Sequence, residues 1–129
     1  MHGFHLIVKQ VNLKIFLGTT VLLASIFFSS ISEANQQQDL HKKAFNFFIK
    51  GKIDEAINTY LKALKTEPDS AKTHHYLGVL YFQIGSGAKA IDHFKKAELF
   101  YKNSKDKNSK HNLDIARNNL EKAYKKLGL

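Results

Sequence analysis

The sequence has no cysteine and no tryptophan, and only one of its 129 residues is proline, Pro68. Without cysteine the chain cannot form disulfides, use thiol chemistry, build a cysteine zinc site or attach a c-type haem. A lipid-modified cysteine after a signal peptide is excluded for the same reason. At this length the sequence predicts at most one small domain.

Catalytic and metal-binding motifs are also missing. The sequence has no nucleophile elbow, no phosphate-binding loop and no isolated carboxylate pair, so we expect neither an enzyme nor a cofactor site. The histidines come without an H-E-x-x-H motif and without a carboxylate at helical i, i+4 spacing. On a helix the adjacent His74 and His75 point about 100° apart. We therefore expect no metal site.

Acidic residues are scarce, with 11 Asp and Glu against 20 Lys and Arg, and the net charge is +9. The basic residues cluster towards the C-terminus: Lys102, Lys105, Lys107, Lys110, Arg117, Lys122, Lys125 and Lys126. A solvated face is the default interpretation of such a run. Attraction to anionic lipid or to an acidic partner is the alternative. No nucleic-acid-binding motif accompanies the charge, so nucleic acid is not expected.

The N-terminal segment differs from everything that follows it. Met1–Lys14 carries two lysines and no acid, Ile15–Phe28 has no charge, and Ser32-Glu33-Ala34 is a small-x-small ending. This order is that of a secretory signal peptide, with cleavage predicted after Ala34. Extended through Ile31, the apolar run is a marginal membrane span, so an inner-membrane anchor at residues 15–31 stays open. Both interpretations export the rest of the chain, to the periplasm or outside the cell.

A helical pattern occurs twice after this segment. Apolar residues at helical spacing predict helices over about 40–50 and 54–66, ended by Gly51 and Pro68. A shift of 34 residues superposes this pair of helices on His75–Ala97, small residue on small and aromatic on aromatic. Small residues let two helices cross closely, and the aromatic residues fill the space between them. The predicted packing residues are Ala44, Phe47, Ala56, Tyr60, Ala63, Leu77, Gly78, Tyr81, Ala90, Phe94, Ala97, Leu120 and Tyr124.

This pattern resembles the tetratricopeptide repeat (TPR) family, helix–turn–helix units of about 34 residues. The resemblance covers about Gln37–Leu129, within a predicted domain of residues 35–129, with repeat 1 at about 37–70 and repeat 2 at about 71–104. It implies an all-α fold, a short α-solenoid of antiparallel helix–turn–helix repeats. The sequence departs from the family pattern at three positions: Lys43 lacks the packing side chain of Leu77, Gly87 stands where Ile53 does, and Lys102 replaces the terminal proline.

A C-terminal capping helix is predicted at about 110–127, after a basic insertion at 103–110. Leu120, Tyr124 and Gly128 match Leu77, Tyr81 and Gly85 at an offset of 43 residues. This helix is therefore interpreted as the first half of a third repeat, of the kind that closes a solenoid. The sequence predicts five helices, or two and a half repeats.

The resemblance implies a binding groove, because in this family the first helices of successive repeats line a concave face. The predicted groove residues are His41, Phe45, Phe48, Ile49, Lys72, His75, Val79, Phe82, Gln83 and Lys122. Three of them, Phe45, Phe48 and Phe82, are not needed by the repeat pattern. They would anchor a partner, or else pack on one another or on a second copy of the chain. The lysine, asparagine and arginine clamp of chaperone-binding members is absent, since His41, Phe45 and Tyr76 occupy matching positions.

The sequence thus predicts an exported protein without catalytic activity. It would act as an adaptor or assembly factor in the cell envelope and bind a peptide or helix of another protein. Aromatic anchors ringed by lysine favour a partner segment that carries acidic residues. The alternative is a membrane-anchored structural homo-oligomer whose basic face lies on anionic lipid.

Overall fold

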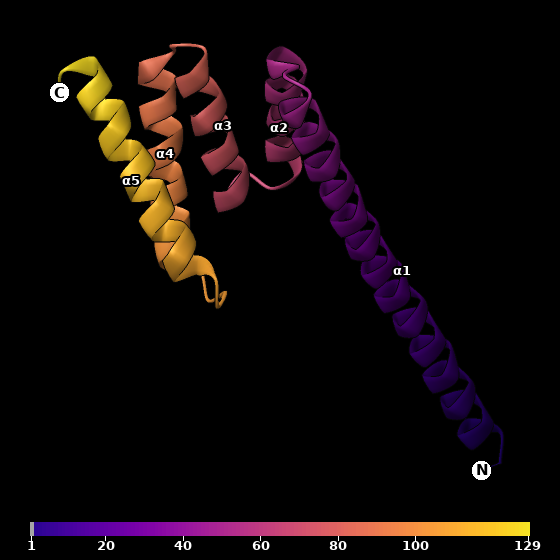
Figure 1. The fold of residues 1–129 in the computed structure, drawn as a ribbon. Helices are drawn as coiled ribbons and strands as arrows, with labels where there is room; N and C mark the ends of the chain where they lie inside the picture. Colours follow the sequence, from indigo (N-terminus) through magenta and orange to yellow (C-terminus); the bar gives the residue numbers. More distant parts are fainter. Residues whose placement is uncertain (1) are drawn as a thin grey trace. The chain divides into compact units, whose positions relative to one another are not determined.

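The computed structural model describes the backbone of residues 2–129 and the side chains of residues 19, 21–26, 28–29, 31–32, 35–36 and 38–129. Within this part the chain forms five helices and no strand, which confirms the predicted all-α fold (Figure 1). The helices are α1 (His2–Ile49), α2 (Ile53–Thr66), α3 (Ala71–Gln83), α4 (Gly87–Asn103) and α5 (Ser109–Leu127). The chain divides into two compact units, residues 1–36 and residues 37–129, and each is described by itself.

The first unit contains the beginning of α1 and carries exposed apolar side chains. Those described with at least 46% exposure are Val21, Leu22, Leu23, Ile26, Phe28 and Ile31. The lysines of the predicted signal peptide and its predicted cleavage residue, Ala34, lie outside the described side chains. Among the described residues, no helix is both long enough and apolar enough to cross a bilayer. Signal peptide and anchor therefore remain predictions.

The start predicted for the first repeat helix is wrong. The sequence predicts a helix over about 40–50, but α1 begins far earlier and runs through residues 35–39 without a break. The segment contains no residue that would end a helix. No glycine occurs between Gly18 and Gly51, and the single proline comes later, so nothing interrupts the helix, and glutamine is a good helix former.

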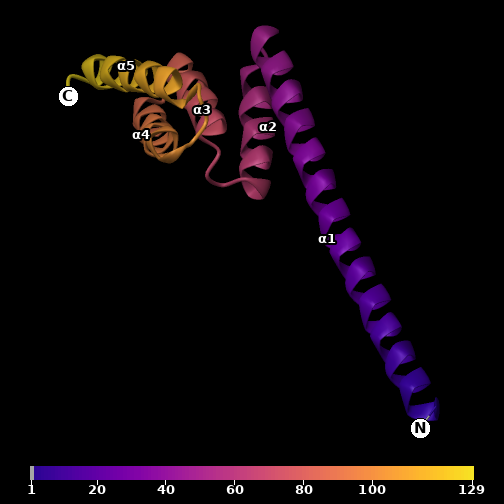
Figure 2. The ribbon, with the colours of Figure 1, turned by 90° about the horizontal axis from the view of Figure 1, so that it is seen from below.

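The second unit stacks its helices in chain order. Helix α3 packs on α2 and on α4, and α5 packs on α4, as the views in Figures 1 and 2 show for α3, α4 and α5. The helix boundaries of the repeats are close to those predicted. Helix α4 runs beyond the usual end of a repeat to Asn103, and residues 104–108 of the basic insertion form the loop before the capping helix α5.

Each first helix of a repeat ends in the same way, at a glycine with a left-handed backbone. The φ angles are +70° at Gly51, +77° at Gly85 and +72° at Gly128, a conformation that only glycine adopts readily. The residue after each glycine donates its backbone N–H to a carbonyl five residues earlier, closing a Schellman turn. The three accepting carbonyls belong to Phe47, Tyr81 and Tyr124. These aromatic residues hold equivalent places at the predicted offsets of 34 and 43 residues.

The core lies between paired helices, where the sequence pattern places it. Of the predicted packing residues, ten are buried, and Phe47, Leu120 and Tyr124 are half-buried. Gly78 of α3 faces the ring of Phe94 in α4 so closely that a Cβ there would lie 2.6 Å from ring carbons. This close approach sets the crossing of α3 and α4. Lys43, which lacks the packing side chain of Leu77, is exposed.

Candidate functional site

Two adjoining hollows lie along helices α1, α3 and α5. The first has a volume of about 290 Å³ and is lined by Gln38, His41, Lys42, Phe45, Tyr60, Lys72 and Tyr76. The second has a volume of about 510 Å³ and is lined by Lys72, His75, Tyr76, Tyr101, Asp106, Asn108, His111, Asn112 and Ile115. Both hollows are lined by Lys72 and Tyr76, which lie one turn apart on α3. The two hollows therefore adjoin at these two residues of α3.

His41 enters the first hollow with one ring nitrogen bonded and the other free. Its Nε2 lies 2.8 Å from the Thr73 hydroxyl oxygen, and the Thr73 hydroxyl donates to the Ser70 oxygen at 3.0 Å. The other ring nitrogen of His41, Nδ1, is buried and has no partner. Burial, assisted by the Lys72 charge, lowers the pKa of His41.

Tyr60 forms the floor of the first hollow. Its side chain is fully buried, its ring stacks on Tyr76 with centroids 5.4 Å apart and planes 5° from parallel, and His41 meets it edge-on. The Tyr60 hydroxyl has no hydrogen-bond partner. Burial, and secondarily Tyr76, raises the pKa of Tyr60, so the group is a neutral O–H donor. A buried hydroxyl left unpaired costs about 1–3 kcal/mol.

His75 supplies a similar unpaired group to the second hollow. The Asn119 amide lies 3.4 Å from His75 Nε2, which it can reach only as a donor. The proton of the neutral ring then resides on Nδ1, which is buried and unpartnered, and burial lowers the pKa of His75. Among the described residues, three buried side-chain polar atoms lack a partner, and all three belong to residues lining the two hollows: His41 Nδ1, Tyr60 Oη and His75 Nδ1.

Two of the predicted aromatic anchors, Phe45 and Phe48, pack against each other. Phe45 is 41% exposed and its ring lies 6.1 Å from Phe48 and 5.8 Å from Tyr76. Phe48 is half-buried against the core, whereas Ile49 is 62% exposed. Phe45 is thus the aromatic residue that combines exposure with a place in a hollow.

The remaining predicted groove residues line neither hollow. Val79 and Phe82 are half-buried against the core, and the Lys126 ammonium lies 4.6 Å from the centre of the Phe82 ring. Gln83 and Lys122 are exposed. The structure therefore brings four of the ten predicted residues to the hollows: His41, Phe45, Lys72 and His75.

Sequence reasoning missed the roles of Tyr60 and Tyr76. Tyr60 was assigned to packing alone, which its burial supports, yet it also lines a hollow. Tyr76 was considered only as a place where a known clamp is missing. The sequence could have indicated Tyr76 as a groove residue, because Lys72 and Tyr76 stand at positions i and i+4 and so share a helix face.

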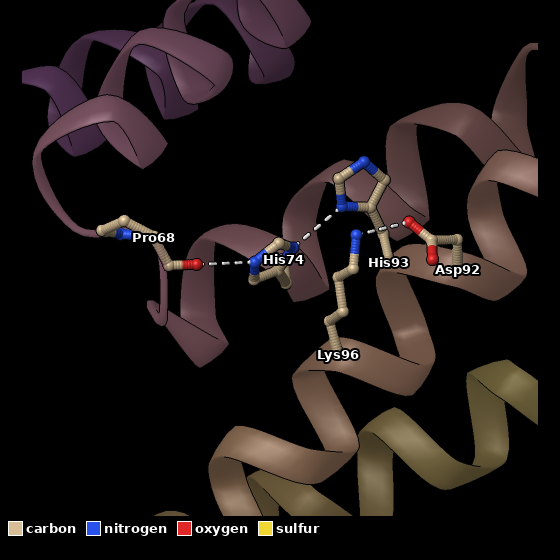
Figure 3. Close-up of polar contacts among 5 residues, drawn as sticks. All are labelled: Pro68, His74, Asp92, His93 and Lys96. Carbon is tan, nitrogen blue, oxygen red and sulfur yellow. Dashed lines mark hydrogen bonds and ion pairs between the residues drawn. The ribbon is translucent and has the colours of Figure 1, made fainter.

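A histidine pair, buried His74 and half-buried His93, joins α3 to α4 away from the hollows (Figure 3). His74 Nε2 lies 2.9 Å from the Pro68 carbonyl, so it is the protonated nitrogen. His74 Nδ1 is then an acceptor, and the proton between it and His93 Nδ1, 2.9 Å away, belongs to His93. Both rings are therefore neutral. The His93 ring also stacks on Tyr81, with centroids 5.4 Å apart.

Burial lowers the pKa of His93 to about 4, with the His74 charge as a secondary cause, and burial lowers the pKa of His74 as well. Nearby, Asp92 and Lys96 form an exposed ion pair at 2.8 Å. In the described residues, no group of three or more histidine, aspartate or glutamate side chains could hold a metal ion. The histidine pair is a structural contact between two helices.

Comparison with known proteins identifies the repeat. Residues 46–85 match the family model described as a TPR repeat, from the end of α1 through α3. This part of the chain is similar to a TPR repeat. The chain is also 40% identical over 47 residues to the BBSome complex member BBS4 of Bos taurus. That similarity covers 36% of this chain and 9% of the relative, so the chain matches only a small part of the relative's length.

The matched residues include part of the lining of the hollows: Tyr60, Lys72, His75 and Tyr76. The hollows lie on the first helices of the units, which is the face predicted for ligand contact from the resemblance. A TPR repeat points to binding of another protein. No catalytic constellation emerges among the residues of either hollow, whose titratable groups are lysine, histidine and tyrosine with one aspartate, Asp106.

Proposed function

We propose that this protein is an exported, non-catalytic adaptor or assembly factor of the cell envelope. It binds a peptide or helix of another protein on the hollowed face of α1, α3 and α5. The observation that supports this proposal is the pair of adjoining hollows on either side of Lys72 and Tyr76. Two hollows that adjoin along α3 suit a segment of chain with side chains in both.

Phe45 provides the sharpest test of this groove. Phe45→Asp places a charge where an apolar anchor would dock, while Phe45 is exposed enough for the protein to tolerate the change. Leu61→Asp is a matched control, because Leu61 is 38% exposed against 41% for Phe45, lies on α2 and lines neither hollow. The tagged full chain would be used to capture partners from envelope fractions.

We expect Phe45→Asp to lose the captured partner and Leu61→Asp to retain it, with helical circular dichroism unchanged in both. Capture that survives Phe45→Asp would refute binding in the groove. Phe48→Asp with Phe82→Asp, a more obvious double change, is a poorer test, because both rings pack against the core.

The exported location is the second part of the proposal. It is supported by the order of basic, apolar and small residues before Asn35. Intact-mass measurement of the mature protein from envelope fractions would test it. A chain beginning at Asn35 indicates a cleaved signal peptide, and a full-length chain in the cytoplasm would contradict export.

An alternative function is that of a membrane-anchored structural oligomer. The specific observation in its favour is the row of exposed apolar side chains between Val21 and Ile31 in the first unit. In that arrangement the lysine-rich residues after Asn103 would lie against anionic lipid. Retention of the full-length chain in the membrane fraction, with loss of binding to anionic vesicles when the lysines are neutralised, would favour it over the adaptor.

A further inference from the structure

A third hollow, with a volume of about 400 Å³, lies along α5. It is lined by Arg117, Leu120, Glu121, Tyr124, Lys125 and Leu129, none of which lines the first or the second hollow. At the offset of 43 residues, four of these lining residues are equivalent to His74, Leu77, Gly78 and Tyr81 of α3. In α3 that is the face against α4, since His74 and Tyr81 contact His93 and Gly78 faces the Phe94 ring.

This face is covered on α3 and open on α5. All four residues of α3 are buried, because α4 packs over them. Of their equivalents on α5, Leu120 and Tyr124 are half-buried, whereas Arg117 and Glu121 are exposed. Among the described helices of the second unit, α5 packs on α4 and slightly on α3, and no helix covers the third hollow. The hollow therefore occupies a position where the preceding repeat holds a helix.

A helix cannot lie on this face as closely as α4 lies on α3. Glu121 stands in the place of Gly78, where even a Cβ would lie 2.6 Å from carbons of the Phe94 ring. An occupant must leave room for the glutamate side chain and offer it a basic partner. It need not neutralise Arg117, because Arg117 Nε already lies 2.8 Å from a carboxylate oxygen of Glu98.

Two side-chain pairs on this face stand at i and i+4 and therefore lie along one side of the helix. One pair is apolar, Leu120 and Tyr124, and the other is charged, Glu121 and Lys125. Neither Glu121 nor Lys125 forms an ion pair with a described residue. Both charges are thus available to a molecule that docks in the hollow.

We propose that this face binds the same face of a second copy of the chain, with the two α5 helices antiparallel. The two-fold axis that relates Leu120 to Tyr124 of the second copy passes at residue 122. The axis that relates Glu121 to Lys125 of the second copy passes at residue 123. A single axis between these two positions serves both pairs and repeats each contact.

Self-complementarity is what a two-fold interface requires, because the same patch meets itself. Here apolar meets apolar and acid meets base. The first and second hollows share no lining residue with this face, so each copy keeps its own pair of hollows. The inference is therefore independent of the proposed function.

The absence of cysteine allows a direct test on the full chain. Asp114→Cys, at an exposed position of α5, supplies one site for a spin label, and pulsed electron double resonance measures the distance between the labels of two copies. The labelled residues would lie about 8.5 residues from the axis on opposite sides. With a rise of about 1.5 Å per residue and helices about 9 Å apart, their backbones should be about 27 Å apart.

Exchange of the two charges assigns the contact to this face. In the labelled chain, Glu121→Lys and Lys125→Glu should each raise the dissociation constant of the dimer at least roughly tenfold, because like charges then meet twice. The variant with both changes should recover the dimer and the distance, since acid again faces base. Lys62→Glu, the same charge change at an exposed position of α2 outside all three hollows, should leave the dimer unchanged.

Three results would overturn the proposal. One is a chain without a defined distance near 27 Å between labels. Another is failure of the double exchange to recover the dimer while its helical circular dichroism equals that of the unexchanged chain. The third is an equal response of Lys62→Glu and Lys125→Glu, which would mean that the copies associate through another surface.

Discussion

His74 Nδ1 lies 2.9 Å from His93 Nδ1, and this contact joins α3 to α4 while His74 Nδ1 is unprotonated. His74 Nε2–H donates to the Pro68 carbonyl, so neutral His74 can only accept from His93 (Figure 3). Protonation of both rings would leave two cationic rings facing each other in a half-buried interface. Acidic pH is therefore expected to weaken the packing of α3 on α4.

Stability is expected to fall between pH 7.5 and pH 5. The pKa of His93 is about 4 in the folded protein and about 6.5 in the unfolded chain, so the unfolded state binds more protons in this interval. The contribution of His93 is complete above pH 7, and about 2 kcal/mol of it is lost by pH 5. Below about pH 3, where His93 is protonated in both states, this group adds no further loss. Urea unfolding of the full chain followed by circular dichroism would measure the change.

His93→Gln separates this effect from the titration of other groups. Glutamine keeps an amide that can donate to His74 but does not titrate, so the difference in stability between pH 7.5 and 5 should shrink by at least about 1 kcal/mol. His111→Gln, at an exposed histidine on α5, should keep the wild-type dependence. An unchanged slope in His93→Gln would show that the pair does not control acid stability.

Gly78→Ala should destabilise the protein by about 1–3 kcal/mol. The added Cβ would lie 2.6 Å from carbons of the Phe94 ring, which is 1% exposed and cannot move aside without separating α3 from α4. The helix propensity of alanine offsets about 1 kcal/mol of the overlap, so the net loss is smaller than the contact alone implies. The midpoint of thermal unfolding would report it.

Gly87→Ala is the matched control for this prediction. Its Cβ would lie 2.7 Å from the Leu127 side chain, which is 45% exposed and can change rotamer. We expect little loss of stability there. Comparable losses in the two variants would mean that the close approach at Gly78 is not what fixes the helix crossing.

Tyr60→Phe should leave the protein as stable as wild type or more stable by up to about 1 kcal/mol. The change removes a buried hydroxyl that has no partner and keeps the ring that stacks on Tyr76. Urea unfolding would measure it. A loss above about 1 kcal/mol would indicate that the hydroxyl has a bound partner in solution.

The ion pair between Arg117 and Glu98 should contribute little. Its atoms lie 2.8 Å apart and join α5 to α4, but the two side chains are 50% and 30% exposed. Exposed pairs typically contribute less than about 1 kcal/mol. Arg117→Ala should therefore lower the free energy of unfolding by less than that amount, and a loss of several kcal/mol would refute this assignment.

The sequence was sufficient to predict the repeat, because helix–helix packing constrains single positions strongly. Gly78 opposite Phe94 and the glycine after each first helix are requirements of geometry, and they recur at fixed spacing. The start of α1 could not be predicted in the same way. A run of glutamine after the apolar segment looks like a linker by composition, but nothing in it stops a helix.

The candidate site was less predictable than the fold. Helical spacing placed His41, Phe45, Lys72 and His75 on one face, and the structure brings them to the hollows. Helical spacing could not predict that the Tyr60 hydroxyl and His41 Nδ1 would be buried without partners. Hydrogen-bond satisfaction depends on which side chains meet across helices. The His74–His93 pair was not predicted, for the same reason. Its position was partly predictable, because His74 lies one turn before Gly78 and therefore faces α4.

In the second unit, the packing of helix on sequential neighbour also bears on how quickly the protein folds. Since α3 contacts α2 and α4, and α5 contacts α4, most of this packing joins residues that are close along the chain. Such local topologies lose little chain entropy before contacts form, and they typically fold in microseconds to milliseconds. The α3–α4 hairpin, with its buried glycine–phenylalanine crossing, is the natural nucleus. Substitutions there should slow folding, whereas those on α5 should mainly speed unfolding.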